Sequence, residues 1–267
     1  MLVDSHSHLD FLPRGKAGVD DLEGALKSAK DGGVGKIITI GTSLKCSRDC
    51  IEIAKKSSSD YLKIYATCGL HPKDAKGEIK NSESTAELVD ELKQLARSEN
   101  FVAIGETGLD YYGSTGDSEK KLQRELFEGQ VKLARELDLP LVIHCRNAWE
   151  EIFQIISNFK LRGVFHCWTG DWRSAKKALD LGFYISFSGL VTFKNAAEIQ
   201  DVAKKAPLEK ILIETDSPFL APEPVRGSIN EPKNVKIVGQ FISSLRNQPF
   251  EEIANATSSN AERLFGI

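Results

Sequence analysis

The chain has 267 residues, of which 41% are hydrophobic and 27% are charged, so it can bury a large core as one α/β barrel or as two ordinary domains. Its formal net charge of −3 argues against a protein that coats nucleic acid by charge alone. No signal segment opens the chain, and no stretch approaches the ~18 apolar residues of a membrane span, so a cytoplasmic protein without a membrane partner is expected.

Short apolar strands alternate with amphipathic helices along the whole chain. The strands are expected at residues 2–8, 36–41, 64–70, 101–105, 140–145, 163–167, 183–187 and 210–215. The helices are expected at residues 20–30, 47–56, 84–97, 120–137, 148–159, 174–181, 196–206, 234–246 and 250–264. A polar loop is expected near residues 73–82, and a proline-rich loop over residues 217–232.

Eight strand–helix units without an evident linker predict an α/β fold with a parallel sheet, closed as a single (β/α)8 TIM barrel over residues 1–267. The competing fold is an open, doubly wound sheet. That fold predicts a glycine-rich phosphate loop after the first strand, where this chain has His6 and His8 instead.

All five histidines follow or end predicted strands, as do several acids. In a barrel these strand ends share one face, where active sites lie. His6 and His8 lie two residues apart on a strand, so their side chains point to the same side, about 7 Å apart along it. The candidate metal ligands are His6, His8, Glu106, His144, His166 and Asp216.

Six donors are too many for one closed tetrahedral ion, and they suit two divalent ions bridged by a carboxylate that together activate a water molecule. Glu106 is the bridge candidate, because its strand lies between the first and fifth strands. Asp216 is the best candidate to hold the water and accept its proton, which makes Asp216 and Glu106 the expected catalytic residues. Glu214 lies on the same strand face and is a candidate to orient a ligand histidine. Imidazole ligands favour Zn or Mn.

The five cysteines show no CxxC spacing and are expected to be free thiols. Cys46 and Cys50 are one turn apart if they lie on a helix, and packing as small hydrophobic side chains is expected for both.

Several motifs resemble those of the TatD family of metal-dependent hydrolases and deoxyribonucleases, which have the amidohydrolase-like barrel. They lie at residues 6–10 (HSHLD), 69–72 (GLHP), 105–110 (GETGLD), 143–144 (IH), 166–170 (HCWTG), 214–218 (ETDSP) and 260–267 (NAERLFGI). The resemblance implies one ion held by His6, His8, Glu106 and Asp216, and another held by Glu106, His144 and His166. It also implies that His71 lies near the substrate phosphate without binding metal, and family nuclease activity suggests Mg.

Two segments depart from the family pattern. Many members have His-x-Arg-Asp after the fifth strand, where this chain has His144-Cys145-Arg146-Asn147. Many have basic residues in the loop after the eighth strand, where this chain has Arg226 followed by a mostly uncharged segment, residues 227–232. Metal binding is expected to survive both changes, whereas how strongly the rim of the site binds nucleic acid is left open.

The family resemblance implies an exonuclease that cleaves phosphodiester bonds of single-stranded DNA in the 3′-5′ direction. His71, Arg146 and Arg226 are expected to meet phosphates, and Trp168 or the pair Tyr111-Tyr112 to stack on bases. The same metal pair also suits a carbonyl-centre hydrolase acting on an ester, lactone, amide or aminoacyl-tRNA. A non-catalytic barrel that binds a partner is disfavoured by the full donor set, and no obligatory protein partner is evident.

Overall fold

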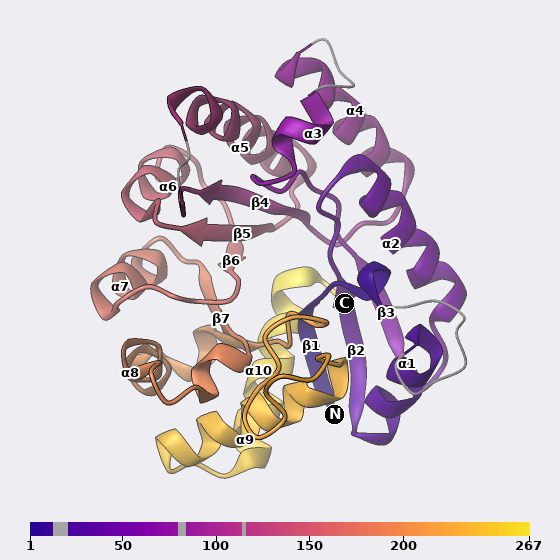
Figure 1. Ribbon diagram of the computed structural model, residues 1–267, viewed down its shortest axis with the longest axis vertical. Coiled ribbons are helices and arrows are strands. Elements are labelled where there is room, and N and C mark those ends of the chain that lie inside the picture. Colours follow the sequence, from indigo (N-terminus) through magenta and orange to yellow (C-terminus); the bar gives the residue numbers. More distant parts are fainter. Residues whose placement is uncertain (13–20, 80–83, 114–115) are drawn as a thin grey trace.

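The computed structural model describes residues 1–12, 21–79, 84–113 and 116–267, and it contains eight strands (Figure 1). Each strand pairs in parallel with the next in two runs, β1 to β3 and β4 to β8. The strands are β1 (Leu2–Ser7), β2 (Val34–Thr39), β3 (Lys63–Ala66), β4 (Ile104–Asp110), β5 (Leu141–Arg146), β6 (Gly163–Phe165), β7 (Tyr184–Phe187) and β8 (Ile211–Ile213).

Two sets of backbone contacts join these runs into a ring. Cys68, just after β3, forms a parallel bridge with Ile104 of β4. Ser7 of β1 forms a parallel bridge with Ser217, just after β8. At this second seam the amide of Asp216 donates to the carbonyl of His6 at 2.9 Å. The eight strands therefore form a closed parallel barrel, which confirms the predicted TIM barrel and excludes the open, doubly wound sheet.

Helices surround the strand ring (Figure 1). They are α1 (Leu22–Asp31), α2 (Leu44–Ser57), α3 (Ala75–Ile79), α4 (Thr85–Ser98), α5 (Asp117–Leu137), α6 (Trp149–Ile156), α7 (Trp172–Asp180), α8 (Ala197–Lys205), α9 (Val235–Arg246) and α10 (Phe250–Phe265). Four of them begin at side chains that accept a hydrogen bond from the first turn: Asp21, Ser43, Ser84 and Asp171. Among the described helices, none is both long and apolar enough to cross a membrane.

Two apolar cores separate the inside of the barrel from its outside. The larger one lies between the strands and the surrounding helices. The smaller one contains barrel-strand residues such as Val3, Ile38 and Val142, together with Leu264 and Phe265 of α10. Helix α10 packs against this inner core at one end of the barrel. The candidate site therefore lies at the opposite end, where the strands terminate in polar residues.

The element boundaries differ from the sequence-based prediction in two places that affect the site. The polar loop expected near residues 73–82 contains the short helix α3, which is anchored by the buried Ala75. The fourth strand runs to Asp110, so Glu106 lies inside β4 rather than after it. Residue 20, the expected start of the first helix, and residues 80–82 of the expected loop lie outside the described residues.

Candidate metal centre

His6 of β1 and His8, which directly follows the end of that strand at Ser7, converge at the carboxyl end of the barrel. The period-2 alternation of a strand puts His6 and His8 on one side, as the sequence predicted. Both side chains are buried, and their Nε2 atoms lie 3.3 Å apart. Asp216, in the loop after β8, brings Oδ1 to 3.3 Å from Nε2 of His8 and 3.6 Å from Nε2 of His6.

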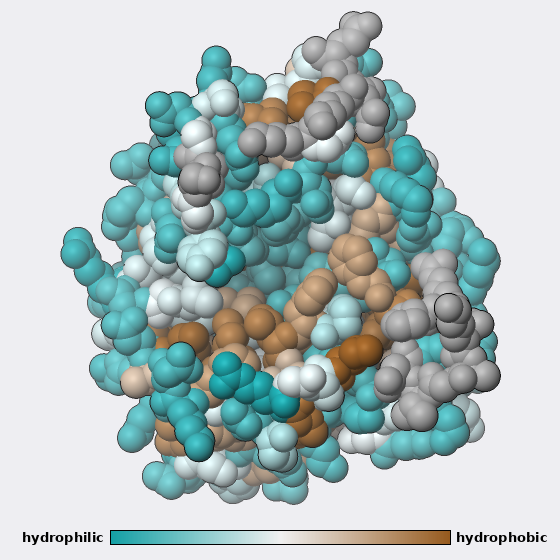
Figure 2. All heavy atoms as spheres, viewed as in Figure 1, coloured by the Kyte–Doolittle hydropathy of each residue, from teal (hydrophilic) through white to brown (hydrophobic). Residues whose placement is uncertain are grey.

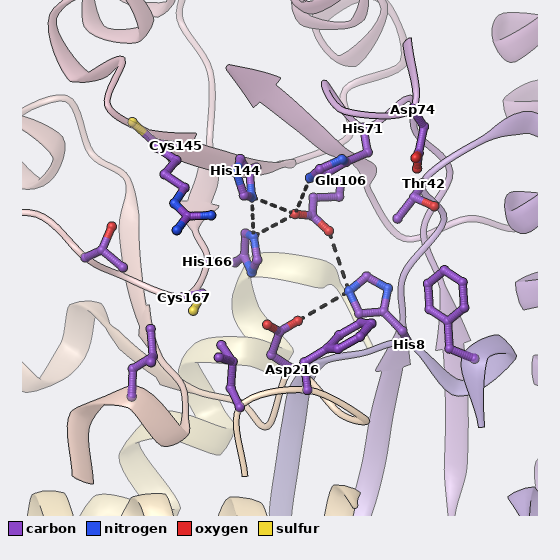
Figure 3. A pocket seen from close by; sticks show the side chains of 16 residues that line it. His8, Thr42, His71, Asp74, Glu106, His144, Cys145, His166, Cys167 and Asp216 are labelled. Carbon is purple, nitrogen blue, oxygen red and sulfur yellow. Dashed lines mark hydrogen bonds and ion pairs between the residues drawn. The ribbon is translucent and has the colours of Figure 1, made fainter. Parts of the chain in front are cut away.

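Glu106 lies at the centre of the site, and its two oxygens face two different groups of histidines (Figure 3). Oε2 lies 3.4 Å from Nε2 of His6 and 3.7 Å from Nε2 of His8. Oε1 lies 2.8 Å from Nε2 of His166 and 3.0 Å from Nδ1 of His144. A carboxylate placed in this way could bridge two cations.

His71 lies closer to this centre than the family resemblance implies. Its Nε2 atom is 3.4 Å from Oε1 of Glu106, so His71, Glu106 and His144 form a third group of converging donors. The other two groups are His6 with His8 and Asp216, and His6 with Glu106 and His166.

Two additional acids, Asp110 and Glu214, lie beside the candidate ligands. Oδ2 of Asp110 lies 3.2 Å from Nε2 of His144. Oε1 of Glu214 accepts a hydrogen bond from the amide of Cys167 at 2.8 Å and lies 3.4 Å from Nδ1 of His166. Carboxylates that orient ligand histidines are a regular part of metal sites. We anticipated this contact for Glu214 but not for Asp110, although Asp110 lies four residues after Glu106 and thus on the same strand face.

The electrostatics of the centre show that its acids stabilise positive charge. Burial opposes the protonated form of His8, but the hydrogen bond and charge of Asp216 outweigh it and raise its pKa to about 9. For His166, burial is likewise outweighed by Glu106, and the pKa lies well above its usual range. The pKa of Glu106 lies well below its usual range, because the charge on His166 and His71 overcomes the effect of burial. His6 is the exception, since burial and the charge of His166 lower its pKa.

The donor set fits divalent metal ions. Imidazole nitrogens and carboxylate oxygens converge within contact distance, and buried acids compensate positive charge there. The Nε2 atoms of His6 and His8 face Glu106 and Asp216, while their Nδ1 atoms are buried without a hydrogen-bond partner among the described residues.

A cavity of about 440 Å³ opens over the centre and includes His8, Glu106, His144, His166 and Asp216 in its lining. Figure 2 shows the hollow, with hydrophobic residues along part of its wall. The apolar lining residues are Phe11, Leu190, Phe219 and Leu220. Phe11 and Phe219 are 52% and 50% exposed, and their ring centroids lie 6.0 Å apart beside His8. Sequence patterning missed this pair, because a single exposed phenylalanine carries no periodic signal.

Of the four residues expected to contact substrate, two line the cavity, one lies away from it, and Trp168 is buried. His71 and Arg146 line the cavity, and the guanidinium of Arg146 lies 3.6 Å from the ring centroid of Tyr112. Arg226 lies over Phe193 and 3.7 Å from Glu223, and it is not among the described residues that line the cavity.

The structure corrects the expectation for Trp168. This side chain is 1% exposed, packs against Trp149 and Phe165, and donates its ring N–H to the carbonyl of Gly170 at 2.7 Å. A ring enclosed in this way has no free face on which a base could stack, so Trp168 is a core residue.

Comparison with known proteins shows the family to which the chain belongs. The family model described as TatD related DNase matches residues 3–266. The chain belongs to the TatD family. It is 40% identical over 270 residues to the uncharacterised metal-dependent hydrolase YabD of Bacillus subtilis (strain 168), covering 100% of both chains. It is therefore a TatD-family metal-dependent hydrolase.

Solved structures support the same fold. The TatD homologue YjjV from Escherichia coli K12 superposes with a TM-score of 0.86 at 30% identity, over 100% of this chain and 98% of that one. An uncharacterised amidohydrolase from Saccharomyces cerevisiae superposes with a TM-score of 0.82 at 21% identity, over 99% of this chain and 100% of that one. Both superpositions show the same barrel fold.

Proposed function

We propose that this TatD-family protein is a deoxyribonuclease that hydrolyses phosphodiester bonds of single-stranded DNA from the 3′ end. The observation that carries the proposal is the position of Glu106, whose two oxygens face histidines on both sides at 2.8 to 3.7 Å. Two divalent ions bound there would supply Lewis-acid activation of water and neutralise charge on the phosphate.

In this proposal the metal ligands are divided between two ion-binding positions. One ion would be held by His6 and His8 together with Glu106 and Asp216. The other would be held by Glu106, His144 and His166. Asp110 contacts the ring of His144 at 3.2 Å and would orient it toward an ion, and Glu214 lies 3.4 Å from Nδ1 of His166 and could act on that ring in the same way.

Asp216 is the proposed general base. Its Oδ1 atom approaches His6 and His8, and the residue lines the cavity. Although burial alone would raise its pKa, the hydrogen bond from His8 and the charges of His6 and His8 hold that pKa below its usual range. The carboxylate is therefore ionised near neutral pH and can accept a proton from the attacking water.

Side chains at the rim of the cavity support a nucleic-acid strand end as the substrate. Arg146 is held against Tyr112, so its N–H groups are available to a phosphate at the cavity edge. The exposed rings of Phe11 and Phe219 offer faces for a base, which Trp168 does not. The family description as a DNase supports the same substrate class. Mg, Mn and Zn remain candidate ions.

The decisive experiment compares substrates with the same metal-loaded enzyme. Oligonucleotides labelled at the 5′ or 3′ end, blunt duplexes and closed circular DNA are incubated with Mg²⁺, Mn²⁺ or Zn²⁺, alongside a panel of esters and lactones. We expect shortening of single strands from the 3′ end and little action on duplexes or circles. Rapid nicking of circles contradicts end-directed cleavage. Turnover of an ester or lactone without any oligonucleotide cleavage replaces the proposal with the carbonyl-centre alternative.

A further inference from the structure

A second group of potential metal ligands lies outside the barrel centre, between η1 (Leu9–Phe11) and the first turns of α2. Sγ of Cys46 lies 3.0 Å from Oδ2 of Asp10, and Sγ of Cys50 lies 3.9 Å from Oδ1 of the same carboxylate. The two sulfurs lie 3.9 Å apart, because residues four apart on a helix share one face. Donor atoms of all three residues lie within 4.8 Å of one another.

These distances are close to those around a tetrahedral zinc ion. With Zn–S bonds of about 2.3 Å, two tetrahedral thiolate ligands lie about 3.8 Å apart, and Cys46 and Cys50 are at 3.9 Å. With a Zn–O bond of about 2.0 Å, sulfur and oxygen ligands lie about 3.5 Å apart. The two sulfur–oxygen distances to Asp10, 3.0 and 3.9 Å, lie on either side of that value.

The contact with Cys46, burial and Asp10 raise the pKa of the Cys50 thiol in the metal-free protein, whereas two features beside the sulfurs favour thiolates that bind an ion. The hydroxyl of Thr39 donates to Sγ of Cys50 at 3.5 Å, and such a hydrogen bond stabilises a thiolate and orients it. Cys46 lies in the first turn of α2, where the helix dipole favours negative charge. A cavity of about 470 Å³ is lined by Asp10 and Cys46, which gives an ion an entry path and leaves room for a water molecule as fourth ligand.

We propose that Asp10, Cys46 and Cys50 form an additional zinc site, separate from the barrel centre and open to solvent at its fourth position. Two thiolates select zinc over magnesium, because magnesium requires oxygen ligands. The bound ion would tie η1 to α2. Since Asp10 follows His8 by two residues, the site would also restrain the chain that leaves the histidine pair.

The test uses reduced, full-length protein that has been stripped with a chelator and then loaded with Co²⁺ or Zn²⁺. The variants are Cys46→Ser/Cys50→Ser, Asp10→Asn and, as the matched control, Cys167→Ser. Cys167 is the control because its thiol lines the cavity over the barrel centre. Circular dichroism verifies that each variant is folded.

We expect Co²⁺ to produce a thiolate-to-metal charge-transfer band in the wild type and in Cys167→Ser, but not in the double variant. The double variant should bind one zinc ion fewer per chain, and Asp10→Asn should bind that ion about 10-fold more weakly or worse. Equal zinc content in the wild type and the folded double variant overturns the proposal. So does a band that is lost in Cys167→Ser and kept in the double variant.

X-ray absorption at the zinc edge tests the wild type without any substitution. We expect sulfur neighbours at about 2.3 Å in addition to nitrogen and oxygen. A zinc-saturated wild type with only nitrogen and oxygen neighbours overturns the proposal. Neither measurement depends on hydrolysis, so failure of the thiolate site is distinguishable from failure of the proposed nuclease function.

Discussion

Both oxygens of Glu106 contact histidines, so we expect its negative charge to matter more for metal binding than the shape of its side chain. Glu106→Gln keeps the volume but removes the negative charge shared by His166 and His144. We expect lower metal content and a loss of kcat on the order of 10²-fold or more. Metal analysis and steady-state hydrolysis measure the two effects, with Glu125→Gln on the surface of α5 as control. Wild-type activity of Glu106→Gln in metal-free buffer contradicts the two-ion proposal.

Asp216 is expected to contribute more to turnover than to metal retention. Asp216→Asn keeps an oxygen ligand beside His8 but is not a useful base. We expect kcat to fall on the order of 10²–10⁴-fold, as is typical when an acid–base group is removed. At least one ion and the affinity for a single-stranded oligonucleotide should be retained. Turnover at the wild-type rate would assign the base to another residue.

The pKa of His8 predicts how metal binding depends on pH. In the metal-free protein this pKa is raised from 6.5 to about 9, so the contribution of His8 to folding stability is fully present below pH 6.5 and is lost as the pH rises through 9. A metal ion needs the neutral ring and displaces the proton. Apparent metal affinity should therefore rise with pH up to about 9, by about tenfold per unit for each proton released. Calorimetry in buffers of different ionisation enthalpy counts these protons, and an affinity that does not change with pH contradicts the assignment.

At the scale of single residues, the sequence predicted the candidate metal ligands better than it predicted which side chains surround each residue. His6 and His8 converge as their two-residue spacing predicts, although β1 ends at Ser7 and His8 follows it, and Glu106 faces both from β4. The burial of Trp168 was not predictable, since its exposure depends on Trp149 and Phe165, which come from other elements. The proximity of Asp10, Cys46 and Cys50 likewise depends on how η1 packs against α2.

At the scale of elements, the cap of α7 offers a test of local stability. Asp171 accepts a hydrogen bond from the amide of Ser174 at 2.8 Å. We expect Asp171→Ala to lower the free energy of unfolding by about 1 kcal/mol. The pKa of Asp171 is lowered by this bond, so its contribution is present above pH 3.8 and is lost as the pH falls below that value. Denaturant unfolding at neutral and acidic pH measures the difference.

Asp180→Ala on the same helix is the matched control for this cap. Asp180 pairs with Lys176 on the exposed surface of α7, and a pair of this kind contributes about 0.3–0.5 kcal/mol. An effect of Asp171→Ala no larger than that of the control contradicts the capping role.

The types and order of the elements were predictable, whereas several boundaries were not. The alternation of strands and helices follows from hydrophobic periodicity, which a single chain carries in full. The extension of β4 to Asp110 was missed, because pairing with β5 continues through polar and glycine residues that carry no apolar signal. Helix α3 was missed because five residues are too few to show a helical repeat.

At the scale of the whole molecule, metal ions at the barrel centre should stabilise the fold. Their ligands come from β1, β4, β5 and the segments after β6 and β8, so bound ions join distant parts of the ring. A ligand at 100 times its Kd stabilises the folded state by about 2.7 kcal/mol, which corresponds to roughly 5–10 °C in Tm for a chain of this size. Calorimetry with and without a chelator measures the shift. The folded His6→Ala variant should show a much smaller shift, and an equal one would place the stabilising ion elsewhere.

The seam between β1 and the end of β8 also sets when the enzyme becomes competent during synthesis. Ser7 and Ser217, 210 positions apart, share a hydroxyl hydrogen bond of 2.7 Å at the same seam that brings Asp216 beside His6. During synthesis His6 and His8 leave the ribosome first. Asp216, the carboxylate beside them at this seam, follows only after seven further strands. Long-range closure of this kind is slow compared with local helix formation. We expect nascent chains and fragments that end before β8 to be inert, so that hydrolysis would report the closure of the ring.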